Sequence, residues 1–230
     1  MENIKIKQSL PSREDGKETR ARIIQCAGQL IAQQGYAKTT SKSICQLAQV
    51  NMAAVNYHFG SRDGLYIAVL KEVHSALLSL DSLQALAAAP LTAEEKIECF
   101  LDKYILIAAD EADWHLQVWA RELLNPSPFI GQIIDEEAKP KLAVLLKIFA
   151  EYLQRPVTDP LLYSSLLGTM APFILMFLGR TSTVSQHIPQ ICSKEQLQKN
   201  IKDFVFAGLE AMKAKEQLTT EKAYMNEKSS

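Results

Sequence analysis

The sequence predicts an all-α fold in two parts, a small three-helix helix-turn-helix domain followed by a larger helical domain. Apolar residues recur along most of the chain at the i, i+3, i+4 spacing of one helix face. No run of alternating β-branched residues lies between hairpin turns, so a sheet is not expected. The chain has 230 residues, 47% of them apolar, which is too long for one helix-turn-helix and sufficient for a second globular core.

Residues 40–66 contain two short helical segments joined by a turn. Thr40 or Ser41 can cap the first helix and Asn51 the second, because their side-chain oxygens accept from the free N–H groups at a helix start. An amphipathic helix over residues 19–36 precedes them. Together the three segments predict a helix-turn-helix unit.

One face of each short helix is expected to be buried, formed by Ile44, Leu47 and Ala48 in the first and by Val55 and Phe59 in the second. The outer face of the second helix carries small or polar side chains, namely Met52, Ala53, Asn56 and His58. A helix with such a slender outer face fits the major groove of DNA, which is about 12 Å wide. The pattern therefore predicts a DNA-reading helix.

The charge distribution also favours DNA binding. Residues 1–71 hold 10 Lys and Arg against 5 Asp and Glu, whereas residues 72–230 hold 15 against 21. A basic first third is what binding to backbone phosphates needs, because Lys and Arg release condensed counterions. The expected phosphate-side positions are Lys17, Arg20, Lys38, Lys42 and Arg62.

The same region resembles the TetR family of bacterial transcriptional regulators. The resemblance rests on the helix at 19–36 and on VNYHFGSRDGLYIAVL at 55–70, where an aromatic-His-Phe run precedes Gly-Ser-Arg-Asp and Leu-Tyr. The chain departs from the family pattern at Gln49, at Met52–Ala53 and at Asn56.

The resemblance implies that double-stranded operator DNA contacts both short helices and the turn after them. The expected DNA-binding residues are Thr40, Ser41, Lys42, Asn51, Met52, Ala53, Ala54, Asn56, Tyr57, His58 and Arg62. Among them we expect Tyr57 and Lys42 to contact phosphates and the residues on the outer face of the second helix to contact bases.

The second part resembles the C-terminal domain of CecR-like members of that family, through RELLNPSPF at 121–129 and LLGTMAPFILMFLGR at 166–180. This resemblance implies a homodimer built from 160–179 and 194–214, and a cavity for a small apolar effector. The candidate pocket residues are Trp114, Trp119, Arg121, Met170, Phe173, Met176 and Phe177. Ordinary core packing is the alternative interpretation of the apolar residues in this set.

We expect a flexible arm at 1–16, the DNA-binding domain at 17–71, the effector-binding and dimerisation domain at 72–215 and a disordered tail at 216–230. Within the third segment, helices are predicted from the Thr92 capping box, at 114–124, at 132–154 with a kink or restart at Pro140, at 160–179, and from the Ser193 capping box to about Lys215. Asp159 is expected to cap the helix at 160–179, with Pro160 in its first turn. The uncharged stretch 161–179 approaches the length of a membrane span. Polar residues interrupt it and no second span exists, so a buried helix at a dimer interface is the favoured interpretation.

An enzyme is not expected, because the chain lacks a glycine-rich phosphate loop, a nucleophile elbow and a dense His/Asp/Glu group. The four cysteines and four histidines show no metal-ligand spacing, so neither a metal nor another cofactor is expected. The interpretation is a cytoplasmic bacterial regulator, associated with the nucleoid when bound to DNA, that acts as a ligand-responsive repressor. A helical dimeric interaction or adaptor protein that lacks a small-molecule response is the alternative.

Overall fold

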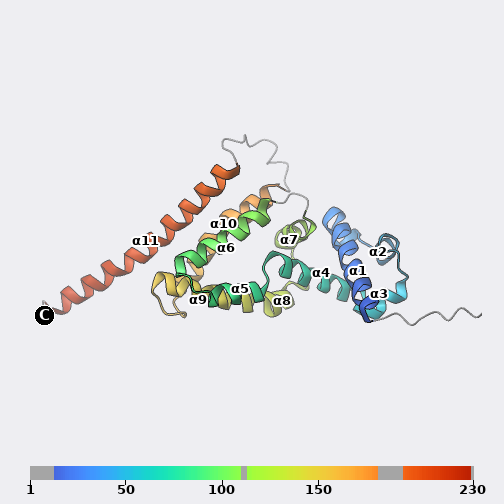
Figure 1. Cartoon of the computed structure of the whole chain (residues 1–230), viewed down its shortest axis with the longest axis horizontal. Coiled ribbons are helices and arrows are strands. Elements are labelled where there is room, and N and C mark those ends of the chain that lie inside the picture. Colours follow the sequence, from blue (N-terminus) through green and yellow to red (C-terminus); the bar gives the residue numbers. More distant parts are fainter. Residues whose placement is uncertain (1–12, 110–112, 181–193, 229–230) are drawn as a thin grey trace, which may run out of the picture. The chain divides into compact units, whose positions relative to one another are not determined.

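The computed structural model describes residues 13–109, 113–180 and 194–228, and the segments it describes contain helices and no strand (Figure 1). The predicted all-α fold is therefore confirmed. The helices are α1 (Arg13–Gln34), η1 (Tyr36–Lys38), α2 (Ser41–Ala48), α3 (Met52–Phe59), α4 (Arg62–Leu77), α5 (Leu80–Ala88), α6 (Ala93–Ala109), α7 (Trp114–Leu124), α8 (Ile130–Ile133), η2 (Ile134–Ala138), α9 (Lys139–Leu153), α10 (Pro160–Arg180) and α11 (Lys194–Lys228). The chain divides into two compact units, Met1–Val73 and His74–Ser230, and the division falls within α4.

The N-terminal unit is built around α1, whose apolar face packs on the short helices that follow. Its buried residues include Ile23, Ala27 and Ile31 of α1, Ile44 and Ala48 of α2, Val55 of α3, and Leu65, Val69 and Leu70 of α4. The prediction that Leu47 is buried was wrong, because its side chain is 49% exposed and Cys45 is buried in its place. The buried stripe of α2 follows i, i+1, i+4, and a helix of only two turns offers too few positions to distinguish this stripe from i, i+3, i+4.

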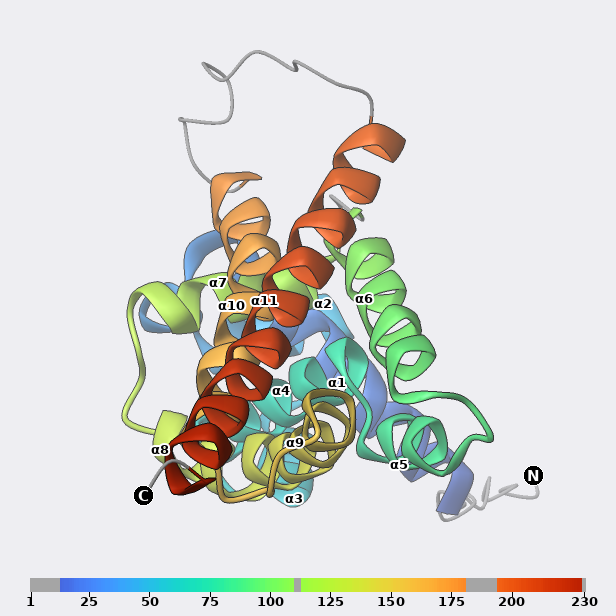
Figure 2. The same ribbon diagram turned by 90° about the vertical axis from the view of Figure 1, so that its left-hand side faces the viewer.

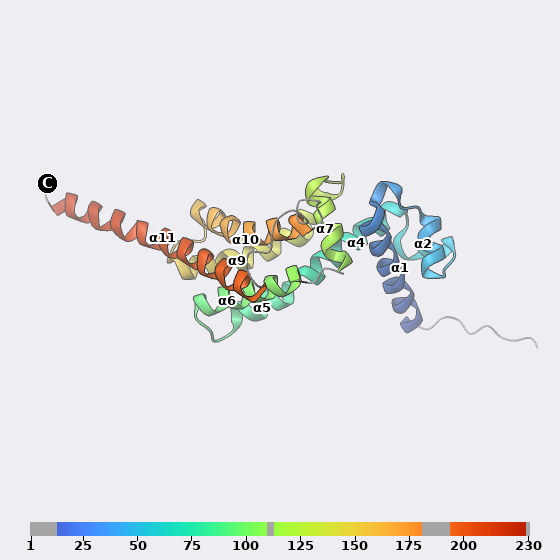
Figure 3. The ribbon, with the colours of Figure 1, turned by 90° about the horizontal axis from the view of Figure 1, so that it is seen from above.

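The C-terminal unit has one main core, to which α6, α9, α10 and α11 contribute (Figures 2 and 3). The largest fully buried side chains of this core are Leu83, Ile97, Phe100, Leu101, Phe149, Leu153 and Leu162. Within the described residues, no helix combines the length and the hydropathy that a membrane crossing needs. The apolar face of α10 instead supplies Leu162, Leu166 and Phe173 to this core.

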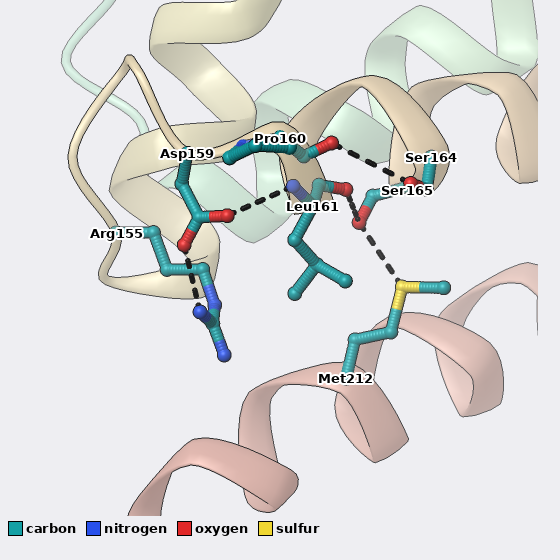
Figure 4. Close-up of polar contacts among 7 residues, drawn as sticks. All are labelled: Arg155, Asp159, Pro160, Leu161, Ser164, Ser165 and Met212. Carbon is teal, nitrogen blue, oxygen red and sulfur yellow. Dashed lines mark hydrogen bonds and ion pairs between the residues drawn. The ribbon is translucent and has the colours of Figure 1, made fainter.

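The start of α10 follows the prediction of an N-cap with proline in the first turn (Figure 4). The Asp159 carboxylate accepts from the Leu161 N–H at 2.8 Å and from the Arg155 guanidinium at 2.8 Å, and these bonds lower its pKa. One turn later the Ser165 hydroxyl lies 2.8 Å from the Leu161 carbonyl oxygen and 3.0 Å from Sδ of Met212 on α11. The hydroxyl groups of Ser165 and Thr169, which interrupt the apolar stretch, are therefore hydrogen-bonded inside the helical unit.

The restart predicted at Pro140 is confirmed and one predicted helix end was wrong. The helix expected at 132–154 consists of α8, a π-helix over η2, and α9, and Pro140 lies in the first turn of α9, where its missing N–H is tolerated. The helix expected to end near Lys215 continues to Lys228, so residues 216–228 are not the disordered tail that was predicted. This segment has no Gly or Pro, and five of its thirteen residues are Glu or Lys, which favour helix.

Candidate nucleic-acid interface

The start of each short helix is fixed by a side chain that the sequence identified. The Thr40 hydroxyl accepts from the Ser43 N–H at 3.1 Å, and the Ser43 hydroxyl accepts from the Thr40 N–H at 3.2 Å, which completes a capping box. The Asn51 side-chain oxygen accepts from the Ala54 N–H at 2.9 Å. Of the two candidates for the first cap, the structure selects Thr40, and Ser41 is the first residue of α2.

The turn between α2 and α3 is made by a residue in a left-handed conformation. Gln49 has φ 53° and ψ 44°, a region in which a residue with a Cβ is strained. The Val50 N–H donates to the Cys45 carbonyl at 3.0 Å, which satisfies a carbonyl of the last turn of α2. Arg22 on α1 donates from Nε to the Ala48 carbonyl at 3.1 Å. The end of α2 is therefore held to α1 immediately before the chain enters α3.

The junction between α3 and α4 depends on two glycines. Gly60 has φ 74°, and the Ser61 hydroxyl accepts from the Gly64 N–H at 3.0 Å. A Cβ added at Gly64 would lie 2.1 Å from the Phe59 carbonyl oxygen, closer than any ordinary contact. The first turn of α4 therefore packs directly against the last residue of α3, and the direction in which α3 points depends on this contact.

Arg62 has an internal role in the structure. Its guanidinium lies 4.2 Å from the centroid of the Tyr36 ring and donates to the Tyr36 carbonyl oxygen. The Tyr36 hydroxyl donates to the Asp63 carboxylate, and its ring stacks on Tyr66 at 4.1 Å. Burial and the bond to Asp63 raise the pKa of Tyr36 to about 12, so the hydroxyl remains a donor at neutral pH. We therefore interpret Arg62 as a residue that fixes the start of α4 instead of one that binds phosphate.

The outer face of α3 matches the expectation of a slender, uncharged surface. Val55 is buried, whereas Ala53 and Asn56 are exposed. Tyr57 is 84% exposed and Met52 is 42% exposed, and Ala54 and His58 are half-buried. The exposed surface of α3 therefore offers one amide, one phenol, one thioether and methyl groups, and of these the amide and the methyl groups are kinds that contact base edges.

In the described part of the N-terminal unit, Lys and Arg residues lie on α1, η1, α2 and α4, and none lies on α3. Lys17, Lys38 and Lys42 are exposed, and Lys42 is in the first turn of α2. The Arg20 guanidinium lies 5.3 Å from the centroid of the Phe59 ring, so it is held beside the end of α3. Lys17 and Arg20 line a pocket of about 250 Å³ together with Ala21, Ile24, Gln25 and Glu72. This arrangement separates the candidate phosphate contacts from the candidate base contacts.

The predicted effector residues lie in the C-terminal unit, and the structure places them in more than one packing environment. Trp119 packs with Leu77, Leu116 and Ala120 in a small cluster apart from the main core. Phe173 is buried in the main core and Met170 packs against that core. Trp114 is buried with its ring 3.7 Å from His115, and Arg121 is exposed. The side chains of Met176 and Phe177 lie outside the described residues.

Sequence reasoning missed Tyr36, Asp63 and Gly64 as positioning residues. A signal for Gly64 was available, because a glycine in the first turn of a helix that follows Gly60-Ser61 is unusual unless the backbone is approached closely. Tyr36 gave no local signal, since its partners are distant in the sequence. Among the residues that the structure describes, no group of three His, Cys, Asp or Glu side chains could hold a metal ion.

Comparisons with known proteins agree with both units. Residues 23–69 match the model of the "Bacterial regulatory proteins, tetR family", and residues 93–212 match that of the "HTH-type transcriptional dual regulator CecR, C-terminal domain". The HTH-type transcriptional regulator TtgR of Pseudomonas putida is 36% identical over 63 residues, which is 27% of this chain and 30% of that protein. The HTH-type transcriptional repressor Rv3405c of Mycobacterium tuberculosis is 34% identical over 130 residues, 56% of this chain and 58% of that protein. The aligned regions thus span less than two thirds of either relative.

Solved structures share the fold at low sequence identity. The fatty acid degradation regulator FadR from Bacillus halodurans has a TM-score of 0.65 at 18% identity, and the alignment covers 83% of this chain and 96% of that chain. FadR from Bacillus subtilis, solved in complex with stearoyl-CoA, has a TM-score of 0.60 at 21% identity, and the alignment covers 80% of this chain and 96% of that chain. At these identities the likeness concerns the fold alone.

Proposed function

The chain belongs to the TetR family of bacterial transcriptional regulators, with a CecR-type C-terminal domain, and we propose that it is a homodimeric repressor that releases a palindromic operator when a mainly apolar small molecule binds. It is a DNA-binding regulator and not an enzyme. Its place of action is the cytoplasm, in association with the nucleoid.

The observation that carries the DNA-reading mechanism is the outer face of α3. Asn56, Ala53 and Met52 are exposed on a helix whose opposite face buries Val55. An amide side chain can pair with adenine through two hydrogen bonds, and methyl groups suit the C5-methyl of thymine. We assign base contacts to this face and phosphate contacts to Lys42, Lys17 and Arg20, with Tyr57 at the boundary between them.

The dimer is supported by apolar side chains that each protomer leaves exposed on α10 and α11. Tyr163 is 54% exposed, Leu167 67% and Phe204 73%. On α11 the exposed positions Phe204, Ala207, Gly208 and Ala211 follow the i, i+3, i+4, i+7 spacing of one helix face. A two-fold interface covers the same patch on both copies, and small residues allow two helices to approach closely. A second copy of this chain is therefore the occupant that we propose, through 160–179 and 194–214.

The effector response is proposed from the family, and its candidate pocket residues lie on α7 and α10. The Bacillus subtilis FadR structure, which has the same fold, was solved with stearoyl-CoA, and this supports a mainly apolar effector. Release of DNA requires that the effector bind one arrangement of the dimer better than another, since equal affinity for both would change nothing.

Selection of bound sequences from a library of random DNA duplexes tests the proposal without requiring that the operator be known. We expect an inverted repeat whose half-sites are separated by about one helical turn, 10–10.5 base pairs. The sequences that Asn56→Ala selects should lose the base preference at one position of each half-site. Lys42→Ala should select the same sequence as the wild type, with weaker enrichment. Failure to enrich any sequence would contradict the proposal and favour an adaptor function. Enrichment of a single half-site would contradict binding as a dimer.

A further inference from the structure

The C-terminal unit contains a buried lysine close to the unit's first residue. Lys141 is 5% exposed, and its ammonium donates to the His74 carbonyl at 3.0 Å and to the Glu137 carboxylate at 3.1 Å. A buried ammonium is unfavourable unless it is paired and hydrogen-bonded. Glu137 is its anionic partner, and the side chain of Glu137 is 25% exposed. Glu137 is thus the member of the pair that solvent can reach.

The imidazole beside this pair lacks a hydrogen bond. Nε2 of His74 is buried and has no hydrogen-bond partner among the residues that the structure describes. Burial and the neighbouring Lys141 ammonium lower the pKa of His74 to about 4, against the opposing effect of Glu137, so the ring is neutral at physiological pH. A neutral imidazole carries one N–H and one lone pair, and a buried polar atom without a partner is unfavourable. A group that pairs with Nε2 would remove this penalty.

Trp119 packs against the His74 ring, with 4.4 Å between the ring centroids and the two rings nearly perpendicular. Leu77, Leu116 and Ala120 pack with Trp119 in a cluster separate from the main core. Glu137 lies on η2, a π-helix, and such local widenings of a helix frequently occur at functional sites. Nε2 of His74, the buried Lys141 ammonium and the Trp119 ring therefore lie close to one residue, His74, outside the main core.

We propose that Lys141 and His74 form the head-group site for the effector and that the effector is an amphipathic carboxylate. Its carboxylate replaces Glu137 on the Lys141 ammonium and accepts from Nε2–H of His74, while its apolar body packs against Trp119. An amine would be repelled by Lys141, and a purely apolar molecule would leave Nε2 unpaired. This inference rests on the proposed effector response and adds the chemical class of the ligand.

The test uses the full chain and two probes of equal chain length, decanoate and 1-decanol. Binding is followed by tryptophan emission, because both tryptophans of the chain lie on α7. We expect decanoate to bind about tenfold more tightly than decanol, since hydrogen bonds to charged groups are stronger than those between neutral groups. Equal affinities for the two probes, or no binding of either, would overturn the inference.

Variants of the pair identify the head-group contact. Lys141→Met should remove the preference for decanoate, and Lys147→Met, which removes an exposed lysine of the same helix, should leave it unchanged. Glu137→Gln should tighten decanoate binding by about fivefold, because it removes the carboxylate that competes for the ammonium, and should not change decanol binding. A role of Glu137 in folding alone would not produce tighter binding.

Glu137→Gln also decides the question if Lys141→Met fails to fold. Unchanged or weaker decanoate binding in Glu137→Gln would then overturn the inference. Binding of the selected DNA is measured on the same preparations. A protein that binds that DNA and shows no carboxylate preference contradicts only the head-group site, whereas one that binds decanoate and no DNA contradicts the proposed regulator.

Discussion

Replacement of Gly64 by alanine tests how the reading helix is held. A Cβ at this position would lie 2.1 Å from the Phe59 carbonyl oxygen and 3.3 Å from its carbonyl carbon. Both are backbone atoms at the end of α3, so no side-chain rotation relieves the contact, and α4 would have to move away from α3. Overpacking of this kind costs about 1–3 kcal/mol. We expect Gly64→Ala to destabilise the N-terminal unit by that amount and to weaken DNA binding at every sequence.

Two other glycines of the same unit provide matched controls. Gly16 on α1 has open space where a Cβ would be, so Gly16→Ala should stabilise the unit by about 0.5–1 kcal/mol through the lower helix propensity of glycine. Gly60 also has open space but has φ 74°, so Gly60→Ala should cost about 1–2 kcal/mol through backbone strain alone. The three substitutions add the same methyl group, and the positions differ in its surroundings and in the backbone conformation.

Urea unfolding followed by two signals separates the units. Both tryptophans belong to the C-terminal unit, so their emission should change little in the three variants. Far-UV circular dichroism reports the helices of both units. The part of its transition that comes from unfolding of the N-terminal unit should shift to lower urea concentration in Gly64→Ala. Equal stability of Gly64→Ala and Gly16→Ala would refute the close packing of α4 on α3.

Three further predictions concern DNA reading, dimerisation and pH. Asn56→Ala should cost about 1–3 kcal/mol on the selected duplex and little on a shuffled one, and equal losses on both would remove Asn56 as a base reader. Lys42→Ala should instead weaken binding to both duplexes and reduce the salt dependence by about one ion, as measured by fluorescence anisotropy. Leu167→Asp or Phe204→Asp should yield folded monomers in sedimentation velocity, because each side chain is exposed in the protomer; an intact dimer in both variants would contradict the proposed interface. His74 is neutral in the folded chain, with a pKa of about 4 against an ordinary value of 6.5, so the unfolded chain binds more protons between these pH values. Protonation of His74 in the unfolded chain therefore lowers the free energy of unfolding by about 3 kcal/mol as the pH falls from 6.5 toward 4, and this stability is fully present above pH 6.5. The decrease in the free energy of unfolding from pH 7 to pH 5, measured with urea, should be smaller in His74→Gln.

The helices of the reading unit were predictable because their determinants are local. Thr40 and Asn51 act on amides three residues ahead, and the face of α3 that buries Val55 follows from helical periodicity. The role of Arg62 was not predictable in this way. Its partner Tyr36 lies 26 residues earlier, and an arginine at a helix start can equally face solvent. Whether such an arginine faces solvent or an internal partner depends on contacts with residues that are distant in the sequence.

The C-terminal unit shows the same division between local and distant determinants. Asp159 and Pro160 identified the start of α10, since capping by a side chain needs only neighbouring residues. The continuation of α11 to Lys228 was missed because a polar segment without Gly or Pro is compatible with either helix or disorder. The apolar stripes of the predicted pocket could not be divided between core and cavity, because periodicity shows that a face is buried and does not show against what.

The most direct test of the central claim is the affinity of the wild-type chain for the selected duplex and for a shuffled duplex of equal length, measured by fluorescence anisotropy at several salt concentrations. We predict two chains per duplex, a specificity ratio of at least about 10³ at physiological salt, and an affinity for both duplexes that falls as salt rises. Equal affinity for the two duplexes at every salt concentration, or binding by a single chain, would contradict a dimer that reads sequence through α3.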